Sequence, residues 1–380
     1  MHLTTLASKA ITKKLVFCIN RFRLRQKKLV VLAVFLFALG WTSHKASTGN
    51  MINSEMNIQT HESPSTILGE RNRNIPNNPD EISIMTDGKN STFNNKTVAV
   101  TRQNEGNSFS MYIYEEKDVV SNSVRTGYWE GGRVQELNDY FIKHSEKHNI
   151  PLSDLTFIDI GANVGWFSFN MAALGVNVLA FEPMKENIQL IRDSLALPDN
   201  VASGVSDRIT LYPHGLGVKD EVCFMYSGDE NVGNGQVKCV ENESNITDVE
   251  LQGRRSIRGR IPVHRLDNVV NIDDEDLRIV AIKMDTEGYE SHVLEGGSKV
   301  LLEGGADAIL SEFVIQFIRE KDGDPVRFIK KMGDGGYHVK LDGKLLSTER
   351  MVERVESNEG FGGVDITLER RVINAPDGEA

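Results

Sequence analysis

Two short stretches of the sequence hold residues whose types and spacing could build a ligand pocket. The first is the turn Gly161-Ala-Asn-Val-Gly165, which follows the apolar run 157–160. Glycines at such a turn let the backbone bend sharply and let a ligand approach closely. The second is Glu182, which closes the run 177–181, where a carboxylate can accept hydrogen bonds from both hydroxyls of a ribose. Together they predict a nucleoside pocket above a strand-helix-strand unit.

The spacing Gly-x-x-x-Gly argues against a dinucleotide pocket. Nicotinamide and flavin binders carry three glycines and hold a pyrophosphate at a free helix N-terminus, and that cradle is missing here. A nucleoside without phosphate fits better, and S-adenosylmethionine is the obvious candidate. The competing interpretation is an ordinary α/β turn, in which Gly161 and Gly165 merely permit the bend.

Candidates for proton transfer follow a second apolar run. Residues 279–285 predict a buried strand that Asp285 ends, and Glu287 follows two residues later. Because pockets of open α/β sheets lie at such strand ends, both acids could orient an acceptor and remove its proton. Glu312, at the next strand end, is a weaker candidate. The alternative for Asp285 and Glu287 is helix capping and turn formation, and Lys283 is expected to pair with one of them.

Histidines and metal ligands give no comparable signal. His214, His264 and His292 could each supply a base, but their spacing selects none. Asp285 and Glu287 without a histidine or a third acid make a poor metal site, so no metal is expected.

These motifs resemble those of the FkbM-type S-adenosylmethionine-dependent methyltransferases. The run Lys-x-Asp-x-Glu-Gly-Tyr-Glu at 283–290 is the most discriminating of them. The resemblance extends over residues 107–345, and its motifs lie at 127–130, 159–165, 181–183, 265–268, 282–290, 293–297 and 311–313.

The resemblance implies a class I methyltransferase fold and transfer of a methyl group from S-adenosylmethionine to oxygen. Hydroxyls of sugars or secondary metabolites are the usual acceptors. It further implies that Asp159 and Gly161 border the methionine half of the cofactor and that Glu182 takes the ribose. The predicted cofactor-binding residues are Asp159, Gly161, Asn163, Gly165 and Glu182.

The chemistry explains why few catalytic groups are needed. Attack on a sulfonium methyl requires the acceptor oxygen about 3 Å away and in line with the departing sulfur, so positioning supplies most of the acceleration. A sugar hydroxyl is a weak nucleophile, and a carboxylate accepting its proton would add about 10²- to 10⁴-fold. Asp285 and Glu287 are the predicted catalytic residues.

The elements that must position these residues alternate between strand and helix. This alternation predicts an α/β domain at 107–372, with an open, mostly parallel sheet and helices on both faces. The polar segment 219–260 is expected to form strands and loops that face the substrate. Further strands are predicted at 109–114, 209–214, 308–313, 337–341 and 364–368, and helices at 134–148, 183–195, 289–302 and 326–332.

The amino-terminal segment predicts a membrane anchor. A basic tail at 1–28 precedes the uncharged run 29–43, a positive-inside pattern that places the tail in the cytosol and the body in the lumen of the Golgi or endoplasmic reticulum. The run is short for a span, which needs about 20 residues, so a cleaved signal peptide and an organelle transit peptide remain alternatives. Residues 44–106 are expected to form a flexible stem, and 373–380 a tail.

Charge argues against nucleic acid as the substrate. Of 43 Lys and Arg residues, nine lie in the first 54 residues, which hold no acid; the other 34 accompany all 54 Asp and Glu, a net charge of −20. A body that acidic repels phosphate backbones. Two body cysteines, Cys223 and Cys239, could pair in an oxidising compartment or stay as free buried thiols. N-glycosylation sequons begin at Asn90, Asn95, Asn242 and Asn245.

The predicted function is a membrane-anchored, S-adenosylmethionine-dependent O-methyltransferase that acts on a glycan or sugar hydroxyl. Methylation of a small lipid or metabolite is one alternative. A catalytically silent domain that binds S-adenosylmethionine is another, which the intact turn and Glu182 disfavour. A nicotinamide-dependent reductase is a third.

Overall fold

The computed structural model describes residues 97–127, 129–240, 255–357 and 364–371. All of them lie in the second of two units into which the chain divides, Asn72–Ala380. The predicted tail, anchor and most of the predicted stem lie outside the described residues, as do the four sequons and the tail at 373–380. Within the described ranges, no helix is both long and apolar enough to cross a membrane.

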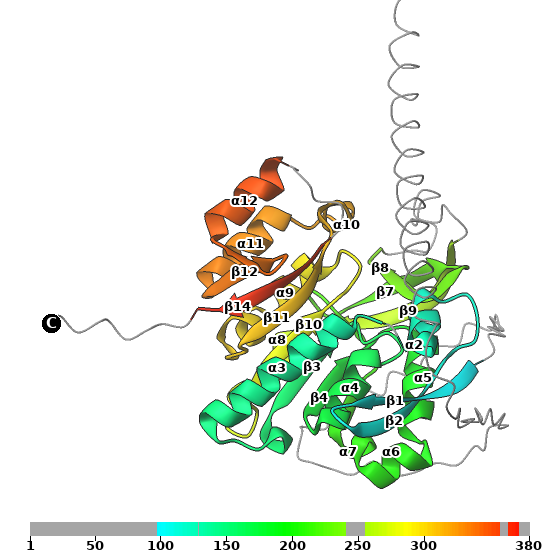
Figure 1. The fold of residues 1–380 in the computed structure, drawn as a ribbon. Coiled ribbons are helices and arrows are strands. Elements are labelled where there is room, and N and C mark those ends of the chain that lie inside the picture. The colour runs from blue at the N-terminus through cyan, green and yellow to red at the C-terminus, as the bar shows by residue number, and fades with distance from the viewer. Residues whose placement is uncertain (1–96, 128, 241–254, 358–363, 372–380) are drawn as a thin grey trace, which may run out of the picture. The chain divides into compact units, whose positions relative to one another are not determined.

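An eight-stranded mixed sheet forms the centre of the fold, in the order β13-β12-β14-β11-β10-β3-β4-β5 (Figure 1). Strands β3, β4, β5, β10 and β11 run parallel, whereas β14 is antiparallel to both neighbours. The predicted α/β sheet is confirmed, with this reversal at one edge. The strands are β3 (Thr156–Ile160), β4 (Asn177–Phe181), β5 (Ile209–Tyr212), β10 (Ile279–Met284), β11 (Ala308–Phe313), β12 (Tyr337–Leu341), β13 (Lys344–Leu346) and β14 (Val364–Arg370).

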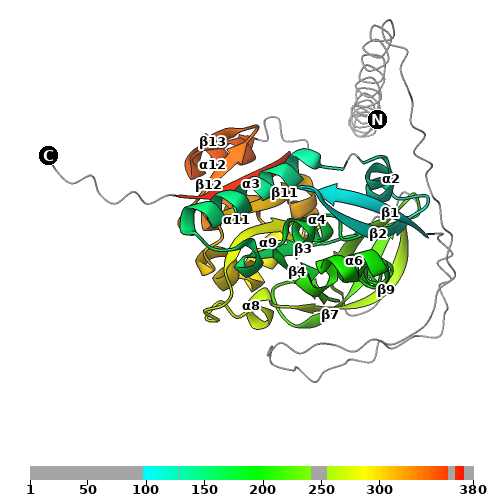
Figure 2. The ribbon, with the colours of Figure 1, turned by 60° about the horizontal axis from the view of Figure 1, so that its bottom comes forward.

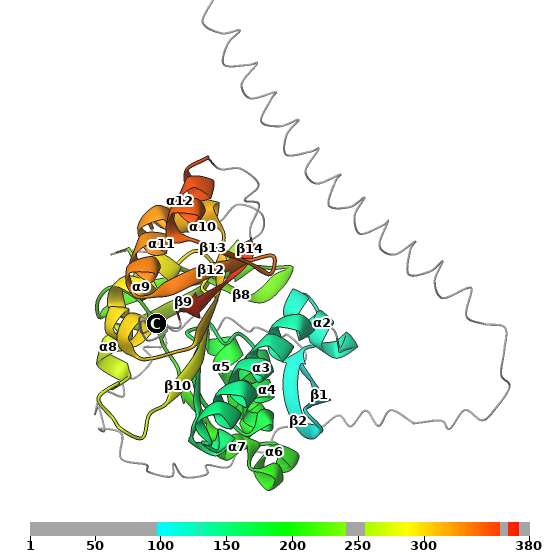
Figure 3. The ribbon, with the colours of Figure 1, turned by 60° about the vertical axis from the view of Figure 1, so that its left-hand side comes forward.

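Helices cover both faces of this sheet (Figures 2 and 3). Phe157 and Ile158 are adjacent on β3 yet belong to different buried clusters, because successive side chains of a strand point to opposite faces. The Phe157 face packs against α3 (Gly131–His148), α4 (Trp166–Leu174), α5 (Lys185–Leu195) and α7 (Val205–Arg208). The Ile158 face packs against α8 (Leu266–Val269), α9 (Glu290–Gly296), α10 (Ile315–Glu320), α11 (Pro325–Asp334) and α12 (Thr348–Ser357).

The remaining helical segments are short. The helix predicted at 289–302 ends early, because α9 stops at Gly296 and a π-helical segment, η3 (Lys299–Glu303), follows. The others, which the sequence pattern did not predict, are α2 (Val119–Thr126), η1 (Leu152–Asp154) and α6 (Pro198–Ser203).

The strand order reverses between β3 and β10. From β3 the sheet grows one way through β4 and β5, and from β10 it grows the other way through β11. Pockets of such sheets form beyond the carboxyl ends of the strands at the reversal. Because β3 ends directly before Gly161 and β10 ends directly before Asp285, the glycine turn and the acids meet there.

The predicted stem is wrong at its carboxyl end, where residues 97–104 form strand β1 (Thr97–Asn104). This strand pairs with β2 (Asn107–Tyr114). The two-residue turn between them, Glu105 and Gly106, has positive φ values of 47° and 82°, as tight hairpins require. Phe109 on β2 stacks on Phe169 of α4 with ring centroids 6.0 Å apart, so the hairpin is part of the folded domain.

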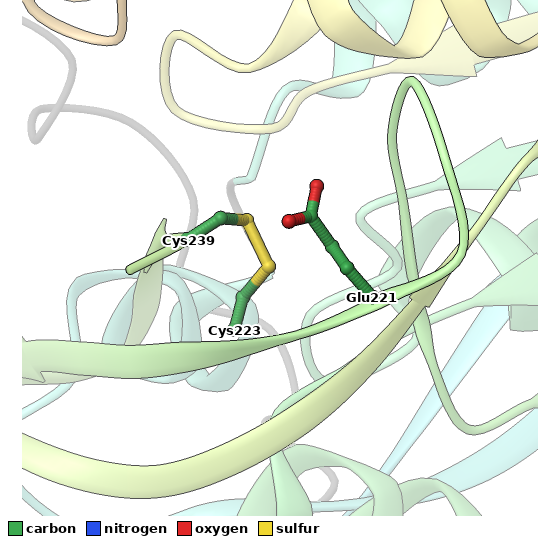
Figure 4. Close-up of side chains that lie close together, drawn as sticks. All are labelled: Glu221, Cys223 and Cys239. Carbon is green, nitrogen blue, oxygen red and sulfur yellow. A yellow bond between two sulfur atoms is a disulfide. The ribbon is translucent and has the colours of Figure 1, made fainter. Parts of the chain in front are cut away.

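A second, four-stranded sheet lies beside the first, in the order β6-β9-β7-β8. It confirms strands in the described part of segment 219–260. Cys223 and Cys239 form a disulfide, and the Glu221 carboxylate lies beside the bridge (Figure 4). The strands are β6 (Gly215–Leu216), β7 (Glu221–Gly228), β8 (Asn231–Lys238) and β9 (Arg255–His264).

Candidate active site

Gly161 lies where the first strand-end turn meets the loop after β10. Its φ is +80°, and a Cβ atom at this position would lie 1.9 Å from the backbone oxygen of Asp285. The positive φ agrees with the predicted sharp bend, but the missing side chain of Gly161 serves a different purpose from the predicted one. It lets two loops of the protein approach each other, whereas the prediction was that it leaves space for a ligand. The backbone N–H groups of Gly161 and Ala162 both donate to the carbonyl of Phe181 at 3.0 Å, which fixes the turn against β4.

Asn163 and Gly165 also shape the turn. Both have left-handed backbones, with φ values of 55° and 88°. A Cβ atom at Gly165 would lie 3.0 Å from the ring of Phe169, so this glycine lets the turn pack on α4. Asparagine tolerates the left-handed conformation better than most residues, and the Asn163 side-chain oxygen accepts the N–H of Val164 at 2.8 Å.

Glu182 lies buried beside the turn, with 4% of its surface exposed. Its Oε2 accepts the N–H of Asn163 and its Oε1 the N–H of Met184, each at 2.8 Å. A carboxylate has about four acceptor positions, and the side chain of Asn187 also interacts with Glu182, so not all of them are taken. Burial raises the pKa of Glu182 to about 7, although these backbone donors lower it. Glu182 therefore holds the turn, and its role toward a ribose stays a prediction.

Asp159 on β3 is completely buried. Its Oδ2 accepts a hydrogen bond from the hydroxyl of Ser168 at 2.6 Å. Its Oδ1 has no hydrogen-bond partner in the part of the chain that the structure describes. Burial raises the pKa of Asp159, and the charge of Lys283 opposes this. Because a buried oxygen without a partner is costly, the Oδ1 of Asp159 is a candidate contact for a hydrogen-bond donor of a ligand.

Three carboxylates meet at the ends of β10 and β11. Asp285, Glu287 and Glu312 each contribute an oxygen within 4.8 Å of the others. We call these residues the acidic trio. The parallel register pairs Met284 with Ser311, which brings Glu312 to the same point as the two predicted catalytic acids. The signal for this in the sequence was that each acid lies at a strand end.

Lys283 pairs with Asp285, as predicted, with 3.1 Å between Nζ and Oδ2. Burial lowers the pKa of Lys283, but the carboxylates of Asp285, Asp159 and Glu130 outweigh this effect and raise it. The ammonium also lies 4.9 Å from the ring centroid of Phe167. Lys283 thus remains charged, and it holds Asp285 in place.

Glu287 is the member of the trio best suited to accept a proton. Burial, reinforced by Asp285 and Glu290, raises its pKa to about 7. Burial and the same neighbours, together with Glu287 itself, raise the pKa of Glu312 to about 10. Both carboxyls therefore hold a proton more tightly than an ordinary glutamate does, and a raised pKa suits a carboxylate that takes the proton of a hydroxyl. Glu287 also has a φ of +55°, a strained backbone of the kind that clusters at active sites.

Turn formation, the alternative role considered for Asp285 and Glu287, belongs to Glu290. The Oε1 of this fully buried residue accepts hydrogen bonds from the N–H groups of Thr286 and Gly288, at 2.9 and 3.3 Å. Glu290 therefore holds the loop through its carboxylate, and Asp285 lines the neighbouring cavity.

A small cavity opens beside the trio, and the sequence reasoning missed one of its acids. Glu130 has a left-handed backbone with a φ of 40°, and burial raises its pKa to about 7. The sequence analysis included Glu130 only as the last residue of the motif at 127–130 and gave it no role. The cavity is lined by Glu130, Arg133, Phe167, Lys283, Met284, Asp285, Leu310, Ser311, Glu312 and Asp365.

None of the three histidines lines this cavity. His214 contacts the ring of His264, and burial lowers the pKa of His214 to about 4. A ring nitrogen of His292 contacts the carbonyl of Lys321 at 2.6 Å. All three have structural contacts, so a histidine base receives no support.

The acidic trio removes one of the arguments against a metal site. No metal was expected because Asp285 and Glu287 lacked a third acid, and Glu312 supplies it. The oxygen spacing would accommodate a divalent cation, but Lys283 already pairs with Asp285. No second observation in the described ranges points to a metal, and none is proposed.

Residues 159–337 match the family model described as the methyltransferase FkbM domain. No curated protein matches the chain. The chain is similar in structure to a methyltransferase FkbM from Methylobacillus flagellatus KT, with 15% sequence identity, 67% of this chain and 62% of that chain covered, and a TM-score of 0.34. It is also similar to magnesium protoporphyrin IX methyltransferase from Synechocystis PCC 6803 with bound SAM, with 9% identity, 67% and 84% covered, and a TM-score of 0.33.

Proposed function

Residues 159–337 form a methyltransferase FkbM domain, and from this premise we propose that the protein transfers a methyl group from S-adenosylmethionine to a hydroxyl of a glycan or sugar. The observation that supports this most is the meeting of two features at the reversal of strand order. The glycine turn follows β3 and lies beside Glu182 at the end of β4, and the acidic trio lies at the ends of β10 and β11.

The cofactor would be held by residues that the fold has already ordered. Glu182 would accept the ribose hydroxyls, and Asp159 would face the cationic methionine end through its unpartnered oxygen. When bound, S-adenosylmethionine supplies a methyl group on a positively charged sulfur.

The acidic cavity suits an acceptor with several hydroxyl groups. Asp285 accepts hydrogen bonds, Glu287 takes the proton of the reacting hydroxyl, and protonated Glu312 donates a hydrogen bond. Phe167 adds an apolar surface to the lining. Four carboxyl groups, those of Glu130, Asp285, Glu312 and Asp365, line the cavity together with Arg133 and Lys283. Hydrogen-bond donors and acceptors are therefore both available to a hydroxylated acceptor.

The direct test is incubation of the purified protein with methyl-labelled S-adenosylmethionine and a panel of neutral glycans, lipids and small alcohols. We expect label on a glycan or sugar oxygen, and calorimetric heat on adding the cofactor alone. Label on a lipid or small metabolite instead would support the alternative acceptor. Heat without label on any acceptor would support a silent binding domain. Absence of heat would contradict both, and a nicotinamide-dependent change in absorbance would indicate a reductase.

We further propose that the body of the protein lies in the lumen of the Golgi or endoplasmic reticulum. The Cys223–Cys239 disulfide supports an oxidising compartment, and the basic tail before an apolar run supports an anchor. In sealed microsomes, we expect the body to resist added protease until detergent opens the membrane. Digestion without detergent would place the body in the cytosol.

A further inference from the structure

The small cavity beside the acidic trio is lined by two sets of residues from different parts of the chain. One set comes from α4, from β11 and from β10 with the residue that follows it, all within the matched residues 159–337. The other set lies outside the matched residues, at the start of α3 and on β14, and we call it the outer wall. It consists of Glu130, Arg133 and Asp365.

Asp365 is fixed in the outer wall by strand pairing. It lies directly opposite Glu312 in the antiparallel register of β11 and β14. Side chains that are directly opposite in such a pair project to the same face of the sheet, and both carboxyls line the cavity. The Oε2 of Glu312 is buried and has no hydrogen-bond partner among the described residues. Because a buried oxygen without a partner is costly, this end of the cavity favours a ligand that carries hydrogen-bond donors.

Arg133 joins the two segments of the outer wall. Its Nη1 donates to Oε2 of Glu136 at 2.9 Å and to the hydroxyl oxygen of Thr367 at 2.8 Å. Its Nη2 lies 3.9 Å from Oδ2 of Asp365. These contacts hold the start of α3 against β14. A guanidinium carries five N–H donors, so donors of Arg133 remain for a ligand in the cavity.

Glu130 contributes a carboxyl group for which no described residue supplies a hydrogen-bond donor. Its backbone carbonyl accepts the N–H groups of Arg133 and Val134 at 2.8 and 3.1 Å, so its main chain begins α3. Its side chain makes no capping hydrogen bond to that helix. Burial raises the pKa of Glu130 to about 7, although the charge of Lys283 lowers it. Since carboxyl groups removed from water are normally hydrogen-bonded, Glu130 lacks a donor that a ligand hydroxyl can supply.

We propose that Glu130 binds a second hydroxyl of the acceptor and thereby selects which hydroxyl is methylated. The inference rests on the proposed function, in which Asp285 and Glu287 face the reacting hydroxyl. A hydroxyl donates one hydrogen bond and accepts two, so a group that donates to Glu130 can accept from Arg133 as well. The outer wall then favours an acceptor with at least two hydroxyls, such as a sugar ring, over an alcohol with one.

The kinetic test compares wild type and Glu130→Ala on the acceptor found for the enzyme and on analogues that each lack one hydroxyl. For wild type, loss of the hydroxyl that Glu130 binds should lower kcat/KM about tenfold or more, the usual effect of a hydrogen bond to a charged group. Glu130→Ala should lose as much on the full acceptor and little more on that analogue. Glu130→Gln keeps an oxygen acceptor and should fall between wild type and Glu130→Ala.

Glu105→Ala is the matched control. Glu105 is also a glutamate with a left-handed backbone, with a φ of 47° compared with 40° for Glu130. It is in the turn between β1 and β2 and does not line the cavity. Alanine is strained at both positions, so the pair separates the backbone effect from the loss of the cavity carboxyl. We expect Glu105→Ala to keep the acceptor selectivity of wild type. If Glu130→Ala loses as much as wild type on every analogue, the inference is overturned.

A binding measurement distinguishes this inference from the proposed function. Neutral sugars and alcohols with one hydroxyl can be titrated by calorimetry into wild type, Glu130→Ala and Glu105→Ala, with S-adenosylhomocysteine, which has no methyl group to transfer. We expect wild type and Glu105→Ala to bind a sugar about tenfold more tightly than Glu130→Ala does. This selectivity in a protein that transfers no methyl group supports the inference and contradicts the proposed function. Methyl transfer to a sugar with equal Kd for all three proteins contradicts the inference alone.

Discussion

Replacing Glu287 with glutamine is expected to lower kcat by about 10²- to 10⁴-fold, the usual contribution of a general base. The fall should occur with little change in the affinity for S-adenosylmethionine, because Glu287 is on the loop after β10 and Glu182 is at the end of β4. Wild-type activity should rise with pH through about 7, since the carboxyl must lose its proton before it can accept one. The variant should lack this rise. Steady-state kinetics between pH 5 and 9 would measure both.

The stability of Glu287→Gln provides the control for this prediction. The pKa of Glu287 in the folded protein, about 7, lies above its ordinary value of 4.5. The stability it contributes is therefore present below about 4.5 and is lost as pH rises through about 7. Glutamine does not ionise, so the variant does not lose this stability at high pH, and it lacks the repulsion between the Glu287 carboxylate and the other two acids of the trio. The variant should therefore be at least as stable as wild type at pH 8. An inactive variant that is also unfolded would not identify a base, whereas retention of kcat within about threefold would contradict the role.

Asp285→Asn should behave differently from Glu287→Gln. Asp285 pairs with Lys283, whose side chain is only 10% exposed. Removing the charge of Asp285 leaves a buried ammonium with less compensation, and unpaired buried charges are strongly destabilising. We therefore expect Asp285→Asn to lower stability as well as turnover. Glu295→Gln, on α9 outside the cavity and paired with Lys331 at 2.7 Å, should change neither kcat nor its pH dependence.

Replacing Glu182 with alanine is expected to weaken S-adenosylmethionine binding by about 100-fold or more. Hydrogen bonds to a charged group contribute about 1.5–3 kcal/mol each, and about 1.4 kcal/mol corresponds to a tenfold change in Kd. Calorimetry would measure the loss. The variant also leaves the N–H groups of Asn163 and Met184 without their acceptor, so the turn itself could be disturbed.

A cycle with modified ligands separates these two causes. For wild type, removing the ribose hydroxyls from the ligand should weaken binding strongly. For Glu182→Ala, the same removal should change Kd little, because the partner of those hydroxyls is already gone. If the deoxy ligand loses equal affinity on both proteins, Glu182 supports the turn but does not contact the ribose.

Local patterns predicted the elements closely where one physical requirement dominated. The strands 308–313 and 337–341 have the predicted bounds, because buried parallel or central strands need near-continuous or alternating apolar residues. Of the hairpin at 97–114, the second strand was predicted and the first was not. The hairpin depends on a two-residue turn with positive φ at Glu105 and Gly106, and the first strand has no long apolar run that would indicate it.

The sequence by itself determined the alternation of strands and helices, the placement of Asp159, Glu182, Asp285 and Glu287 at or near strand ends, and the match of residues 159–337 to the methyltransferase FkbM domain. These depend on residues close together in the chain, whose periodicity and spacing can be read directly. Tertiary structure decided which of these residues meet. Glu312 joins the trio because β11 pairs with β10. Glu130, in the segment before α3, lines the same cavity as Asp285 and Glu312. Position 161 requires glycine because the backbone carbonyl of Asp285, in another loop, lies against it. Such contacts join residues more than twenty positions apart, and only the packing of the folded chain fixes them.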